Sequence, residues 1–184
     1  GKYFSTALAT YIYSMIALIF IALIYISVVK NWFKKIPFRM TIMGLFTTLI
    51  ISGVTLNVVR PKFYELASAS GLCFTAIGMF FIINSGIFQK KKIKKSFLFL
   101  SALFMGLAVL ARVTAVFWCF ACVIWILYGL IQNNKQNGKN AIEIIKYVLA
   151  AGVPYVVFGL IQMWYNYARF GSVFDFGIQY SLTI

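Results

Sequence analysis

The chain has 184 residues, of which 62% are hydrophobic, and its mean hydropathy is +0.92. A soluble domain of this size has no need of so much apolar surface, and several runs reach the roughly 20 residues that cross a bilayer core. The formal net charge is +14, but the cations gather in short loops, which is the pattern that orients membrane proteins and not that of a nucleic-acid surface. We therefore expect an all-α, polytopic membrane helical bundle whose partner is the lipid bilayer and not nucleic acid.

Apolar runs separated by charged loops predict about six transmembrane helices in one integral-membrane domain, 1–184. The longest run, 96–131, has 36 residues, and Arg112 is its only charge. One helix of that length would measure about 54 Å against a hydrocarbon core of about 30 Å. We therefore predict two spans with a tight turn near Arg112. The predicted spans are 6–29, 40–59, 66–88, 96–111, 113–131 and 144–165.

Three of these spans have distinctive sequences. The span over 40–59 is rich in Thr, Ser and Gly, which favours close helix packing over lipid contact. The span over 96–111 is short, and the span over 144–165 contains Pro154, which predicts a kink. Cys119 and Cys122 form a C-F-A-C pair inside a span. Because the chain has no His, we interpret them as small buried apolar side chains and not as metal ligands.

The loop charges predict the orientation in the membrane. Twelve of the 17 cations fall in three alternate loops. Lys and Arg prefer the cytoplasmic side, so these loops should be cytoplasmic and both chain ends extracytoplasmic, in the plasma membrane. The aromatic segment 166–184 should then lie at the extracytoplasmic interface. Because the chain begins at Gly1 without Met and ends within a motif, we expect it to be a piece of a longer protein. The twelve cations are Lys30, Lys34, Lys35, Arg39, Lys90, Lys91, Lys92, Lys94, Lys95, Lys135, Lys139 and Lys146.

The five remaining cations are predicted to lie on the extracytoplasmic side, against this preference, so their positions need another explanation. Three of the five are Arg, whose planar fork can grip a phosphate with two hydrogen bonds. Two interpretations stay open. The outer charges either snorkel to the lipid headgroups and pair with nearby acids, or they line a site for an anionic headgroup. The outer side gathers Arg60, Lys62, Tyr64, Glu65, Arg112, Arg169 and Asp175.

Four outer stretches carry a resemblance to a known family. They are G-K-Y-F from Gly1, R-P-K-F-Y-E from Arg60, G-L-A-V-L-A-R-V-T from Gly106 and N-Y-A-R-F-G-S-V-F-D-F-G from Asn166. In this order and spacing the chain resembles bacterial membrane proteins of the GT-C glycosyltransferase superfamily, of the dolichyl-phosphate-mannose-protein mannosyltransferase-like kind. The chain departs from the family pattern at Val113, where such proteins often have Pro.

The resemblance implies transfer of a sugar from a polyprenyl-phosphate donor on the extracytoplasmic face. It implies a catalytic carboxylate in an outer loop upstream of Gly1, so we assign no catalytic residue here and expect this piece alone to be inactive. The acceptor, whether glycan, lipid or protein, stays open. We expect no cofactor in this chain, and whether the full-length protein uses a divalent metal stays open. The implied ligands of the lipid phosphate are Arg60, Lys62, Arg112 and Arg169. Weaker candidates for substrate contact are Tyr64, Glu65, Tyr167, Asp175 and Gln179.

Two other functions remain possible from the residues alone. A transporter or flippase would need polar side chains along a path through the membrane, and the Thr and Ser row of 40–59 is its only candidate. A non-catalytic assembly subunit would need the outer charges only to snorkel.

Overall fold

The structure is a computed structural model that describes residues 5–59, 63–89, 92–137 and 141–175. This part of the chain is helical and contains no strand, which confirms the expected all-α fold. The helices are α1 (Thr6–Trp32), α2 (Phe38–Ile51), α3 (Val54–Val59), α4 (Phe63–Asn84), α5 (Lys95–Ala111), the 3-10 turn η1 (Val113–Ala115), α6 (Val116–Asn137) and α7 (Ala141–Phe170).

Four segments of the described chain are long and apolar enough to cross a membrane. They lie in α1, α4, η1–α6 and α7, and they comprise Thr6–Trp32, Tyr64–Asn84, Val113–Asn134 and Ile142–Phe170. The apolar helices α2 and α5 are shorter, at 14 and 17 residues. The fold is therefore consistent with a membrane protein. The number of six spans and the orientation of the chain in the membrane stay predictions.

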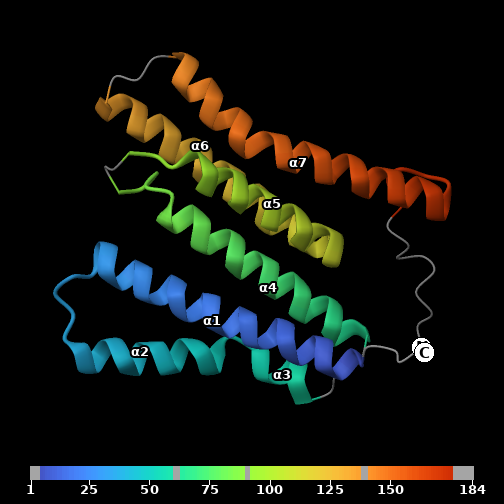
Figure 1. Ribbon diagram of the computed structural model, residues 1–184, viewed down its shortest axis with the longest axis horizontal. Coiled ribbons are helices and arrows are strands. Elements are labelled where there is room, and N and C mark those ends of the chain that lie inside the picture. The colour runs from blue at the N-terminus through green and yellow to red at the C-terminus, as the bar shows by residue number, and fades with distance from the viewer. Residues whose placement is uncertain (1–4, 60–62, 90–91, 138–140, 176–184) are drawn as a thin grey trace.

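Successive long segments run in opposite directions through the bundle (Figure 1). The main interfaces join α1 to α4, α4 to α5, and α5 to α7, while α2 and α3 flank α1. Helix α6 has much sparser contacts with α5 and α7. One apolar core lies between α4, α5, α6 and α7 around Leu98, Met105 and Ile126, and a second lies between α1, α3 and α4 around Ala17 and Cys73.

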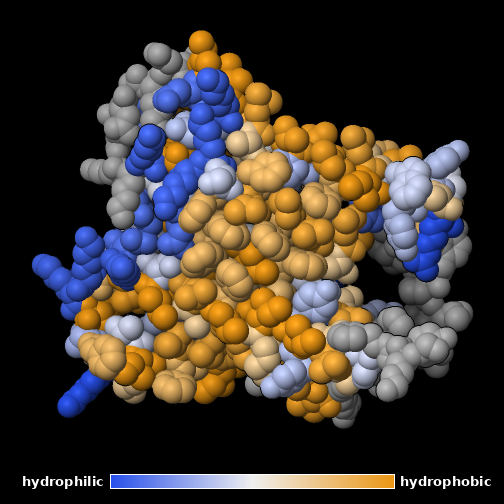
Figure 2. All heavy atoms as spheres, in the orientation of Figure 1, coloured by the Kyte–Doolittle hydropathy of each residue, from blue (hydrophilic) through white to orange (hydrophobic). Residues whose placement is uncertain are grey.

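The alternation brings the Lys-rich segments to one end of the bundle. The α1–α2 loop, the α4–α5 connection and the start of α7 lie together there (Figure 1), and hydrophilic residues gather at this end in Figure 2. We call it the Lys-rich end. The start of α4, the turn after α5 and the end of α7 lie at the other end, which we call the Arg112 end.

The turn predicted near Arg112 is present. Helix α5 ends at Ala111, and Arg112 is extended, with φ −151° and ψ 112°, before η1 begins. The apolar stretch 96–131 therefore folds back on itself at the predicted place. Pro154 lies buried within α7, which continues through it.

Other boundaries differ from those predicted. The span expected over 40–59 is divided into α2 and α3 at Ser52 and Gly53, where Gly53 adopts a φ of +72° that other residues avoid. Helix α4 ends at Asn84, and turns follow it where the span was expected to reach residue 88. Helix α7 runs to Phe170, so the first five residues of the segment 166–184 are helical. Gly171, with φ +72°, closes α7 by donating its N–H to Tyr167 O at 2.9 Å.

Candidate functional site

A groove at the Arg112 end combines a cation, amides and aromatic rings. It lies between the end of α5, η1 and the last turns of α7, and its volume is about 390 Å³. We call it the α5–α7 groove. Its polar side chains all come from α7, while α5 and η1 supply apolar ones. The lining residues are Leu110, Ala111, Val113, Ile161, Gln162, Trp164, Tyr165, Asn166, Arg169 and Phe170.

Arg169 is the predicted phosphate ligand that lines this groove. It lies in the last turn of α7, where the helix dipole favours a cation. Its Nη1 donates to Tyr165 Oη at 2.8 Å, and its guanidinium carbon lies 5.9 Å and 5.2 Å from the ring centroids of Tyr165 and Phe170. Since a guanidinium has five N–H donors, the bond to Tyr165 leaves others that can reach an anion.

Asn166 ties the chain beyond α7 back onto the helix. Its side chain is buried, with 1% exposure. Its Oδ1 accepts a hydrogen bond from Gln162 Nε2 at 2.9 Å, and its Nδ2 donates to Val173 O at 3.1 Å. One amide therefore shapes both the wall of the α5–α7 groove and the turn that follows Gly171.

Arg112 lies on the other side of the end of α5 and does not line the groove. Its Nη1 donates to Ser68 Oγ at 2.5 Å, so the guanidinium is directed toward α4. Gly71 allows this approach, because a Cβ there would lie 3.4 Å from Arg112 Cβ. The structure thus brings Arg112 and Arg169 to the same end of the bundle but places them on different sides of α5.

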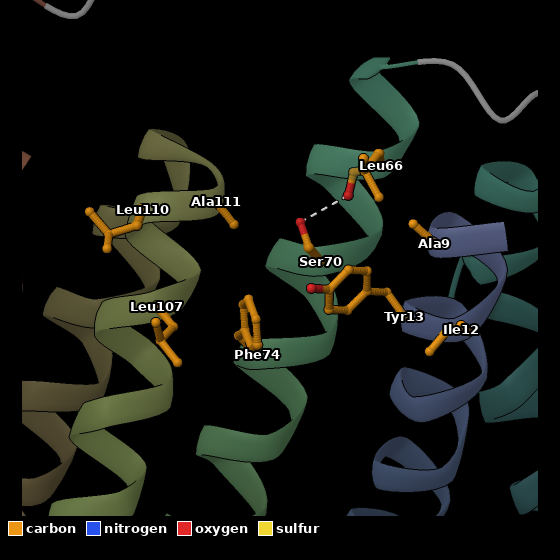
Figure 3. A pocket seen from close by; sticks show the side chains of 9 residues that line it. All are labelled: Ala9, Ile12, Tyr13, Leu66, Ser70, Phe74, Leu107, Leu110 and Ala111. Atoms are coloured by element: carbon orange, nitrogen blue, oxygen red, sulfur yellow. Dashed lines mark hydrogen bonds between the residues drawn. The ribbon is translucent and has the colours of Figure 1, made fainter. Parts of the chain in front are cut away.

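An apolar cleft lies next to the groove. It has a volume of about 580 Å³ and is formed by α1, α4 and α5 (Figure 3). Tyr13 and Phe74 point into it, and the Ser70 hydroxyl donates to Leu66 O at 2.9 Å within its own helix. Leu110 and Ala111 line both this cleft and the α5–α7 groove. The tip of α5 is therefore the wall between an apolar cleft and a groove that contains Arg169.

The weaker candidates are distributed around the same end. Glu65 lies in the first turn of α4, and its Oε2 is buried and has no hydrogen-bond partner within the described residues. Tyr64 and Tyr167 are exposed, and Asp175 is partly buried in the segment after α7. Arg60, Lys62 and Gln179 lie outside the described residues. The described part of the chain contains no group of three His, Cys, Asp or Glu side chains that could hold a metal.

Sequence reasoning missed Asn166, Gln162 and Ser68. The spacing of Gln162, Asn166 and Arg169 places them on one face of a helix, so extending the predicted span by one turn would have grouped them. No comparable signal identifies Ser68, because its contact with Arg112 joins residues 44 positions apart.

Comparisons with protein-family models, with curated protein sequences and with solved structures found no significant match to this chain. The resemblance to the GT-C superfamily therefore stays a prediction. The function has to be argued from the residues and the geometry of the Arg112 end.

Proposed function

We propose that this chain is part of a GT-C-like glycosyltransferase, which transfers a sugar from a polyprenyl-phosphate donor on the extracytoplasmic face of the plasma membrane. The main observation behind the proposal is that the α5–α7 groove and the apolar cleft are adjacent and share Leu110 and Ala111 as lining residues. A lipid-linked sugar needs cations and hydrogen-bonding groups at headgroup level and apolar walls beside them. Both kinds of surface meet at the tip of α5.

The residues of the groove fit separate parts of such a donor. Arg169 can contact the phosphate, because a guanidinium pairs with phosphate oxygens through charge-assisted hydrogen bonds. Trp164 offers a face on which a sugar ring can stack, and the Gln162 amide can hydrogen-bond sugar hydroxyls. When the bond between the sugar and the phosphate oxygen breaks, negative charge grows on the phosphate. A fixed guanidinium stabilises that charge more in the transition state than in the ground state.

The experiment measures sugar transfer by the whole protein in membranes, with a panel of radiolabelled polyprenyl-phosphate sugars. Arg169→Ala and Arg112→Ala should abolish transfer while the protein is still inserted at normal levels. Arg169→Lys should retain part of the activity, because it keeps the charge but loses the fork. Lys146→Ala is the matched control, since Lys146 is an exposed cation at the opposite end of α7. Unchanged transfer in both Ala variants would remove the phosphate-binding role.

A transporter fits the described residues less well. The break between α2 and α3 is the feature that favours one, because discontinuous helices are typical of transporter sites. The hydroxyls along α2, however, are already bonded to its own backbone. Thr47 Oγ1 donates to Met43 O at 2.9 Å and Thr48 Oγ1 donates to Gly44 O at 2.7 Å. These donors are engaged within the helix and not directed toward a substrate path.

A further inference from the structure

Two thiols and a thioether meet inside the core between α4, α5, α6 and α7. Cys119 and Cys122 lie three residues apart on α6, so they share one face of that helix. The Cys122 thiol donates to Met79 Sδ of α4 at 3.6 Å, and the Cys119 thiol donates to Met105 O of α5 at 3.4 Å. The two cysteines belong to this core, and Met79 packs against it. We call Cys119, Cys122 and Met79 the sulfur cluster.

The thioether changes what the two cysteines can bind. Along the sequence they are a pair of thiols in a chain without His, which is too few ligands for a Zn²⁺ site. The tertiary structure adds Met79, which lies 43 positions before Cys122. Thiolate and thioether are soft ligands, and this combination favours Cu(I). Structural Zn²⁺ is held instead by four thiolate, imidazole or carboxylate ligands.

Cu(I) can bind here without leaving a net charge in the apolar core. A buried isolated ion is very unfavourable, and the thiolate, not the thiol, is the form that binds a metal. When Cu(I) enters, the Cys122 thiol releases its proton and the sulfur bonds to copper, while Met79 Sδ donates a lone pair. One positive charge arrives and one leaves. The copper stays Cu(I), so the step consumes no oxidant or reductant.

The Tyr155 hydroxyl lacks a partner beside the same sulfurs. Its oxygen is buried and has no hydrogen-bond partner within the described residues, and Tyr155 interacts electrostatically with both Cys119 and Cys122. Burying a hydroxyl without a partner is unfavourable. A metal-bound thiolate is a charged acceptor and therefore a stronger one than a thiol. Copper binding would thus supply the acceptor that the Tyr155 hydroxyl lacks.

A cavity joins the sulfur cluster to the Arg112 end. It lies between α5, α6 and α7, has a volume of about 200 Å³, and is lined by Cys119 and by Val116, the first residue of α6. At 1.5 Å per residue, Cys119 and Cys122 lie about 4.5 Å and 9 Å along the helix from Val116. The sulfurs are therefore about one to two turns below the end of α6, within reach of an ion that enters there.

We propose that Cys119, Cys122 and Met79 form a Cu(I) site that links α6 to α4. Cys122 and Met79 hold the ion, and Cys119 supplies a further sulfur on the same face of α6. Helix α6 has sparse contacts with α5 and α7, so a bridge through copper adds a connection that packing does not provide. The site goes beyond the proposed glycosyltransferase function and does not depend on it.

Copper binding is measured on the whole protein in detergent, without oxygen, by competition with a chromogenic Cu(I) chelator. Even outer-shell partners of a metal contribute about 10–100-fold in affinity, so Cys122→Ser should raise the Kd by more than about 100-fold, and Met79→Leu and Tyr155→Phe by about tenfold each. Met79→Leu nearly conserves volume, so the fold should persist. Cys73→Ser is the matched control, because Cys73 is buried on α4 but belongs to the other core.

Wild-type affinity in both Cys122→Ser and Met79→Leu would overturn the proposal, and so would an equal loss in Cys73→Ser. Cu(I) should also raise the unfolding temperature of the wild type and of Cys73→Ser, but not that of Cys122→Ser, because binding to the folded state stabilises it. Stabilisation of Cys122→Ser by the same amount as the wild type would place the copper elsewhere.

X-ray absorption of the copper-loaded protein identifies the donor atoms directly. The spectrum should show sulfur neighbours alone in the wild type and one sulfur fewer in Met79→Leu. Nitrogen or oxygen neighbours would overturn the sulfur cluster as the site. Equally tight binding of Zn²⁺ with the same dependence on Met79 would overturn the selection of Cu(I). None of these measurements uses sugar transfer, so the copper site and the proposed function can each fail while the other stands.

Discussion

Arg112 and Ser68 join two helices at the end of the bundle where the candidate site lies. Arg112 Nη1 donates to Ser68 Oγ at 2.5 Å, and the bond connects the first turns of α4 to the residue that follows α5. Arg112, a predicted phosphate ligand, is thus held against α4 by the Ser68 hydroxyl. Replacing Ser68 and Arg112 one at a time separates the structural role of their hydrogen bond from the proposed phosphate-binding role of Arg112.

Ser68→Ala should lower the free energy of unfolding by about 0.5–1.5 kcal/mol, the usual net value of one hydrogen bond. Denaturant unfolding in detergent measures this change. Sugar transfer should persist, since the guanidinium stays in place. Arg112→Ala should cost similar stability, and the double variant should cost no more than either single one. Additive losses would mean that the two side chains do not interact in solution.

Gly106→Ala and Gly152→Ala should have opposite effects. A Cβ at Gly106 would collide with the Phe158 ring, so α5 and α7 must separate, and overpacking of this kind costs typically about 1–3 kcal/mol. A Cβ at Gly152 meets open space, so Ala there should stabilise α7 by up to about 1 kcal/mol. Thermal unfolding of both variants in the same detergent compares them directly. A loss of stability in Gly152→Ala would show that the space beside it is occupied by the protein itself.

Asn166→Ala should loosen the turn after α7. The change leaves Val173 O without its donor and Gln162 without its acceptor, which locally costs about 1–3 kcal/mol. Hydrogen exchange of the amides in 171–175 should become faster, while those of α1 should not change. Asn166→Asp should restore only the bond from Gln162, because a carboxylate cannot donate to Val173 O. Full protection in Asn166→Asp would contradict the role of the Nδ2 donor.

The two ends of the bundle should be accessible from opposite sides of the membrane. Single cysteines are placed at Lys34 and Thr114, which are exposed at the Lys-rich end and the Arg112 end. Cys73, Cys119 and Cys122 are first replaced by Ser. An impermeant maleimide added to intact cells should label the cysteine at 114 and not the one at 34. Labelling of both from outside would refute the alternating arrangement, and labelling of 34 alone would invert the orientation.

Much of the helix pattern could be predicted because apolar run lengths and loop charges are local properties. The turn at Arg112 followed from a run too long for one crossing, and the gathering of the Lys-rich loops followed from their alternation. The break at Gly53 was not predicted, since glycine alone does not show whether a helix continues through it. The end of α7 was placed too early because Asn166, Tyr167 and Arg169 were interpreted as interfacial residues and not as helical ones.

The sequence by itself determined an all-helical chain with its charges divided between two ends, because bilayer thickness and the cost of buried charge act on each segment separately. Only the tertiary structure decided which side chains meet at the Arg112 end. It directed Arg112 to Ser68 and Arg169 to its own aromatic neighbours, and it left space beside Gly152 and Gly159. These features depend on how α4, α5, α6 and α7 pack against one another, and contacts between distant segments leave no trace in the periodicity of any one of them.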